Sequence, residues 1–102
     1  MANTSDIREM QKIQSEWIKS VLPNRVVGKT VIKLVGEAAE LLEAVSYLDK
    51  PTKAKELADV VILCLDIAEL EDIDIVQAFH DKMDENRKRE WVVGDGCIAH
   101  KE

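Results

Sequence analysis

Apolar residues recur every three or four positions along most of the chain, the spacing of amphipathic helices. Each such segment carries one apolar stripe that can face a core. The pattern predicts four helices, over about residues 6–21, 29–47, 53–70 and 72–91. We expect Thr4 or Ser5 to cap the first helix, Thr52 the third and Asp72 the fourth, because short polar side chains accept hydrogen bonds from free helix amides.

Proline and glycine mark the limits of these helices. Pro23 follows the first, and Pro51 is expected to stop the second, because the residue before a proline avoids the helical conformation. Gly94-Asp95-Gly96 predicts a loop near the end of the chain. We therefore expect one all-α domain over residues 1–102, with a helical core at about 6–91 and a C-terminal loop or tail at 92–102.

The third predicted helix is apolar in every direction around its axis, since Val60–Leu65 contains no polar residue. A helix of this kind is buried on all sides. Three other helices in a short chain can hardly enclose it. The sequence therefore predicts a four-helix bundle-like protomer that assembles through its helices into a dimer or a dimer of dimers. A central helix in a monomeric bundle is the alternative.

Composition narrows the class of protein. Apolar residues make up 46% of the chain and charged residues 33%, as in soluble globular domains, and the formal net charge is −6. The absence of a basic face argues against binding a nucleic acid polymer. Val60–Leu65, the longest apolar run, is too short to cross a membrane. No signal peptide is recognisable, so we expect a cytoplasmic protein.

Two pairs of carboxylates stand in apolar surroundings. Glu37 and Glu40 are three residues apart on the second helix, and Glu56 and Asp59 are three apart on the third. Residues at this spacing are neighbours on a helix surface. The same spacing occurs in Glu40/Glu43, Glu71/Asp74 and Asp81/Asp84. Only the first two pairs are surrounded by Ala, Leu and Val, where solvated charges are not expected.

The two pairs can form one site, because helices joined by a short turn lie antiparallel as neighbours. Carboxylates about 5 Å apart repel by roughly 3 kcal/mol at an effective dielectric of 20. Either the four groups are exposed and carry little meaning, or they cluster and bind cations. Oxygen ligands favour Mg²⁺ or Mn²⁺ over zinc or copper. A di-iron bundle needs Glu-x-x-His, whereas Gln77 precedes His80.

Glu37-x-x-Glu40, followed after fifteen residues by Glu56-x-x-Asp59, resembles the MazG-like nucleotide pyrophosphohydrolases, an all-α superfamily. The sequences around these motifs, at 33–44 and 55–61, are similar to those of that family, as is the closing segment 82–91. The resemblance covers about residues 30–91. One position departs from it, because Gly36 stands where many members carry a glutamate.

The resemblance implies that a nucleoside or deoxynucleoside triphosphate and water give the monophosphate and pyrophosphate, with Mg²⁺ as cofactor and Mn²⁺ as a substitute. It implies helical dimers or dimers of dimers, and a role such as housecleaning of the nucleotide pool. The resemblance also implies that four carboxylates are metal ligands: Glu37, Glu40, Glu56 and Asp59. Glu40 is also the candidate that accepts the proton of the attacking water.

Four further residues are candidates for substrate binding. By the resemblance, Lys82, Asn86 and Arg89 contact phosphates or sugar. Two of them, Lys82 and Arg89, also suit the C-terminal end of a helix for electrostatic reasons alone. Trp17 follows the apolar spacing of the first helix, which favours a core position over stacking on a base. Two other functions stay open: a non-catalytic helical oligomerisation module, and a phosphoribosyl-ATP pyrophosphohydrolase of the same superfamily.

Overall fold

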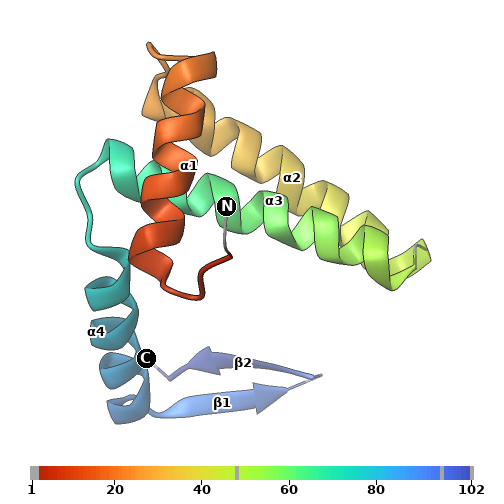
Figure 1. Ribbon diagram of the computed structural model, residues 1–102. Coiled ribbons are helices and arrows are strands. Elements are labelled where there is room, and N and C mark those ends of the chain that lie inside the picture. The colour runs from red at the N-terminus through yellow and green to blue at the C-terminus, as the bar shows by residue number, and fades with distance from the viewer. Residues whose placement is uncertain (1–2, 48, 95, 102) are drawn as a thin grey trace.

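The computed structural model describes residues 3–47, 49–94 and 96–101. Within them the chain forms four α-helices and a C-terminal β-hairpin (Figure 1). The elements are α1 (Ile7–Val21), α2 (Val27–Tyr47), α3 (Lys50–Leu70), α4 (Ile75–Lys88), β1 (Trp91–Gly94) and β2 (Cys97–His100). The predicted helical fold class is confirmed.

The long helices α2 and α3 form an antiparallel hairpin, and α1 lies across α3 (Figure 1). This confirms that the two carboxylate-bearing helices are neighbours. The small core contains Ala44, Leu65 and Ala68, which are buried. By contrast, α4 extends away from the other helices and contacts mainly α1. The protomer is therefore a three-helix body with a projecting arm formed by α4 and the hairpin.

The helix caps differ from the prediction by one to three residues, and aspartate is the cap in each case. Asp6 caps α1 by accepting from the amide of Arg8. Asp49 caps α3 by accepting from the amide of Thr52 at 2.9 Å. Carboxylates stabilise helix N-termini both as acceptors and as negative charges. The expected caps Thr4, Ser5 and Thr52 are therefore wrong.

The cap at Asp49 also explains the position of Pro51. With the cap at Asp49, Pro51 lies in the first turn of α3, where its missing amide hydrogen has no helical partner to lose. The fourth helix begins at Ile75 with Asp74 as its cap, instead of near Asp72. Asp72 has a positive φ of 54° in the turn after α3, a conformation that aspartate tolerates better than most residues.

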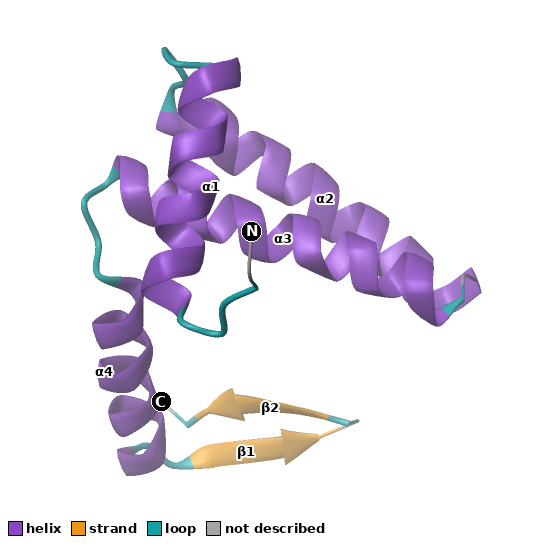
Figure 2. Cartoon of the chain, viewed as in Figure 1, coloured by secondary structure: helices purple, strands orange, loops and turns teal. Residues whose placement is uncertain are grey.

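The C-terminal segment is a β-hairpin rather than the loop or tail that the glycines predicted (Figure 2). The strands pair antiparallel, with Val92 opposite Ala99 and Val93 opposite Ile98. β-branched residues favour strands. Gly96 has a φ of 75°, which suits glycine at a reversal of the chain. Asp95, part of the predicted loop, lies outside the described residues.

Apolar side chains remain exposed on the three-helix body. On α3, Val61 and Ile62 are about 40% exposed, so one protomer covers only part of the helix that the sequence predicted to be fully buried. On α2, Val35 and Leu42 are 67% and 70% exposed. Large apolar side chains exposed in this number on two neighbouring helices favour an interaction surface. In the described part of the chain, no helix combines the length and hydropathy needed to cross a membrane.

An ion pair fixes the connection between α1 and α2 onto α3. Arg25, in that connection, donates from Nε to both oxygens of Asp66 at 2.8 and 3.0 Å. The side chains are only 6% and 3% exposed. Arg8 and Asp74 form a second pair between elements, but both are more than half exposed. Removing one partner of a buried pair leaves an uncompensated charge away from water, whereas exposed pairs contribute little.

We therefore expect Asp66→Ala to lower the free energy of unfolding by about 3–5 kcal/mol, because the Arg25 guanidinium stays buried without a counter-charge. Arg8→Ala is the matched control and should cost no more than about 1 kcal/mol. Urea denaturation at a fixed protomer concentration measures both. Equal losses would show that burial of the Arg25–Asp66 pair is unimportant.

Candidate metal and nucleotide site

Three of the four predicted metal ligands converge. One carboxylate oxygen each from Glu37, Glu56 and Asp59 lies within 4.8 Å of the others. Glu37 comes from α2, and the other two come from successive turns of α3. The i,i+3 spacing of Glu56 and Asp59 on α3 and the antiparallel packing of α2 against α3 bring the three groups together. Three negative charges at this separation repel strongly unless cations lie between them.

Glu40 stands beside this cluster, one turn after Glu37. A hydrogen bond with the Glu37 carboxyl, which requires a proton on one of the two groups, raises the pKa of Glu40. The negative charges of Glu37 and Glu56 raise that pKa further, and Lys33 opposes them. Glu40 is exposed. Glu40, the fourth predicted ligand, therefore lies at the edge of the cluster, where the negative charges of the other carboxylates act on it.

The cluster fits divalent cations. Oε2 of Glu37 and Oε2 of Glu56 are buried, and neither has a hydrogen-bond partner among the described residues. Buried carboxylate oxygens without partners are rare, because their desolvation is costly. Oxygen donors from two or three carboxylates are the ligands that Mg²⁺ and Mn²⁺ prefer. Lys33 supplies the nearest positive charge, with Nζ 3.2 Å from Oε1 of Glu37.

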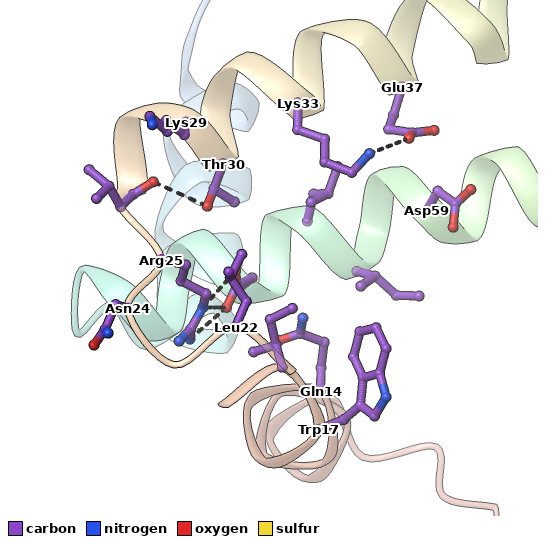
Figure 3. A pocket seen from close by; sticks show the side chains of 15 residues that line it. Gln14, Trp17, Leu22, Asn24, Arg25, Lys29, Thr30, Lys33, Glu37 and Asp59 are labelled. Carbon is purple, nitrogen blue, oxygen red and sulfur yellow. Dashed lines mark hydrogen bonds and ion pairs between the residues drawn. The ribbon is translucent and has the colours of Figure 1, made fainter. Parts of the chain in front are cut away.

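A cavity of about 710 Å³ opens beside the cluster, and Glu37 and Asp59 line it (Figure 3). Its walls come from α1, the α1–α2 connection, α2 and α3. The volume is in the range of small-molecule sites. Trp17, expected in the core, is instead 58% exposed and lines this cavity. The core position was wrong because α1 lays this face over an open space instead of over another helix.

Most of the residues that line the cavity were not predicted as site residues, and the buried polar ones among them include Gln14, Arg25 and Asp66. Asp66 lies two turns beyond Asp59 on the same side of α3. A charged residue directly after the apolar run Val60–Leu65 was a signal that a buried partner exists. Gln14 follows the same three-to-four spacing as Trp17 on the first helix, so a polar residue on an apolar stripe was the available signal. Nothing in the sequence around Arg25 pointed to the cavity, because its position depends on how α1 crosses α3.

The three substrate-binding candidates near the end of α4 and just after it do not line this cavity within one protomer. Lys82 lies 3.4 Å from Glu85, and Arg89 pairs with the same glutamate. The backbone carbonyl of Asn86 accepts a hydrogen bond from Nε1 of Trp91 at 2.7 Å. Oδ1 of Asn86 is buried without a partner in the described chain. Their roles in binding substrate stay predictions.

The model of the MazG nucleotide pyrophosphohydrolase domain matches residues 28–93, which include the whole carboxylate cluster. The chain belongs to this family. The match confirms the resemblance seen in the sequence and, with it, the predicted class of enzyme, a nucleotide pyrophosphohydrolase. The MazG domain covers α2, α3, α4 and the start of the hairpin, whereas α1, which carries Gln14 and Trp17, precedes it.

Two phage proteins named dATP/dGTP diphosphohydrolase are similar to this MazG chain. The protein of Salmonella phage PMBT28 is 45% identical over 99 residues, which are 96% of this chain but 32% of that protein. The protein of Cyanophage S-2L is 36% identical over 95 residues, or 92% of this chain and 87% of the relative. The chain thus spans about a third of one relative and most of the other.

A solved structure has the same fold. The Cyanophage S-2L MazG-like pyrophosphohydrolase, bound to dGDP and three catalytic Mn²⁺ ions per active site, superposes with a TM-score of 0.82 at 34% identity. The match covers 97% of this chain and all of that one. Metal binding by a MazG-like enzyme of this fold agrees with the cation site that the carboxylate geometry indicates here.

We expect Glu56→Gln to weaken Mn²⁺ binding by about tenfold or more, or about 1.4 kcal/mol, because it removes a charge and a ligand oxygen from the cluster. Asp84→Asn is the matched control. Asp84 belongs to an exposed acidic pair of the same i,i+3 spacing and contacts Arg87. Isothermal titration calorimetry without nucleotide measures both affinities. Equal Mn²⁺ affinity of the two variants would exclude a metal site at the cluster.

Proposed function

We propose that this MazG chain hydrolyses purine deoxynucleoside triphosphates to the monophosphate and pyrophosphate, with Mg²⁺ as its cofactor and Mn²⁺ as a substitute. The single observation that carries the proposal is the convergence of Glu37, Glu56 and Asp59 beside a nucleotide-sized cavity. The names of the phage relatives support the choice of dATP and dGTP. Removal of unwanted nucleotides from the cytoplasmic pool is the role we propose.

The chain's own residues divide the work. Glu37, Glu56 and Asp59 would hold the cations, which when bound neutralise phosphate oxygens and make water a better nucleophile. Glu40, at the edge of the cluster, accepts the proton of the attacking water. Lys33, whose amino group is near Glu37, is placed to contact a phosphate oxygen.

We further propose that the protein assembles from at least two copies of the chain and that each copy completes the site of its partner. The exposed apolar residues of α2 and α3 support burial by a partner. The projecting α4 arm supports contributions across the interface, because Lys82, Asn86 and Arg89 lie outside their own protomer's cavity. Placed over a partner's cavity, these residues would contact the phosphates, as the family resemblance implies.

For the reaction, we expect the wild-type protein to release pyrophosphate from dATP and dGTP in the presence of Mg²⁺. Glu40→Gln should lower kcat by about a hundredfold or more, because it removes the base while keeping the size of the side chain. Glu43→Gln, one turn further along α2 and also exposed, is the control and should keep wild-type activity.

A panel of ribonucleotides, deoxynucleotides and phosphoribosyl-ATP separates the alternatives. Hydrolysis of phosphoribosyl-ATP alone would replace the proposed substrate. Equal pyrophosphate release by wild type and Glu40→Gln would reject the proposed base. No release from any substrate, with Mn²⁺ still bound, would favour the non-catalytic oligomerisation module.

For the assembly, sedimentation should give a mass of at least twice the protomer's 11.5 kDa. Leu42→Glu should shift the protein toward the monomer, because a charge on this exposed apolar stripe opposes burial. Glu43→Gln is again the control, because Glu43 follows Leu42 directly but is already polar, so its substitution adds no charge to the apolar stripe. A wild-type protein that sediments as a monomer at micromolar concentration would contradict the proposed assembly.

A further inference from the structure

The side chain of Gln14 is buried in the wall of the cavity yet lacks a partner. It is only 8% exposed, and its Oε1 is buried with no hydrogen-bond partner in the described chain. Native proteins satisfy nearly all buried polar atoms, because an unpaired one loses its hydration without compensation. Since Gln14 lines the cavity that Glu37 and Asp59 also line, a ligand in that cavity can supply the missing partner.

The other buried polar side chains that line the cavity around the α1–α2 connection already have partners. Arg25 and Asp66 satisfy each other through the buried ion pair. Thr30 donates from its hydroxyl to the carbonyl of Val26 at 3.4 Å. Among the described residues that line the cavity, Gln14 and Glu37 each have a buried oxygen without a hydrogen-bond partner, and Gln14 is the one outside the carboxylate cluster. The indole of Trp17 stands beside it on α1 and offers a flat apolar surface (Figure 3).

The positions of the carboxylates in the cavity indicate which part of a bound nucleotide would reach Gln14. Glu37 and Asp59 line the cavity from α2 and α3, and Asp66 lies two helical turns beyond Asp59 on α3, about 10 Å along the axis. Phosphates belong at the carboxylate end, where cations bind. The base then lies toward α1, between Gln14 and Trp17.

A carboxamide presents a donor and an acceptor side by side. Adenine presents a donor at position 6 and an acceptor at position 1, whereas guanine presents the reverse. Rotation of the Gln14 amide by 180° exchanges its oxygen and nitrogen, and the terminal torsion of glutamine is broad and nearly two-fold. One side chain can thus pair with either purine in the same position, which neither a carboxylate nor an ammonium group can do.

We propose that Gln14 reads the Watson–Crick edge of the base and that rotation of its amide allows the site to accept both dATP and dGTP. The inference rests on the proposed function, and it adds the residue that sets base preference. Gln14 is a specificity determinant that contacts substrate, and it takes no part in the transfer of the phosphoryl group.

The test compares kcat/KM for dATP, dGTP and the triphosphate of deoxyribosyl purine, which lacks a group at position 6. In Gln14→Glu the carboxylate cannot donate, so it loses the contact with adenine N1 and with guanine O6. Guanine alone offers two adjacent donors, N1–H and N2–H, and a shift of the base by one ring position lets both carboxylate oxygens accept from them. We expect activity on dATP to fall about tenfold to a hundredfold more than activity on dGTP. Gln77→Met, on the exposed face of α4, is the control and should keep the wild-type ratio.

Gln14→Met provides the second variant, since it keeps the length of the side chain without the charge. It should lower activity on dATP and dGTP alike by about tenfold and abolish the preference for dATP over the purine analogue. An unchanged dATP-to-dGTP ratio in Gln14→Glu would overturn the proposal. If that variant does not fold, an undiminished preference over the analogue in Gln14→Met would overturn it.

Calorimetric binding of dAMP and dGMP in Mg²⁺ separates this inference from the proposed function. If the wild type binds both nucleotides, Gln14→Met weakens both about tenfold, and no triphosphate is hydrolysed, then the proposed function fails and the base reading stands. If triphosphates are hydrolysed but the Gln14 variants keep wild-type base preference and nucleotide affinity, then the base reading fails and the proposed function stands.

Discussion

Electrostatic repulsion among carboxylates is the constraint on which this structure depends. Glu37, Glu56 and Asp59 are held together by the packing of α2 against α3, although like charges at this distance favour separation. Lys33 compensates only one of them. The helical hairpin therefore stores an unfavourable charge arrangement that divalent cations relieve. Folding of the hairpin and affinity for metal are coupled, because the packing that brings the groups together also creates the binding site.

The periodicity of the sequence was sufficient to predict this part of the molecule. The spacing on two neighbouring helices left two alternatives, exposed carboxylates or a cluster, and the packing of α2 against α3 brings three of the four together. The helix ends were less predictable, because Asp49 and Thr52 are both good caps and lie within one turn. The hairpin was missed because glycines around position 95 outweighed the β-branched residues that flank them. In that segment, the pairing of Val92 with Ala99 and of Val93 with Ile98 decides the structure.

The wall formed by α1 could not be predicted from the sequence, because it depends on tertiary contacts. Arg25 reaches Asp66 across 41 positions of the chain, and this ion pair holds the connection that carries α1 back over α3. The crossing turns Trp17 toward the cavity and buries Gln14 beside it. Local periodicity reports only which face of a helix is apolar. It cannot distinguish a face that covers a core from one that lines a ligand site.

The division of the cavity into two ends has a consequence for specificity. In the proposed function, cation-mediated contacts at the carboxylates would recognise phosphates, which every nucleoside triphosphate has in common, so they would contribute affinity without selecting a base. Discrimination must come from the α1 wall, where a polar group left unpaired by the wrong ligand carries a large penalty. The two ends are physically linked, because α1 packs across α3, the helix that carries Glu56 and Asp59. A change in the α1 wall therefore acts on base preference most directly where its side chain faces the cavity and does not contact the cluster.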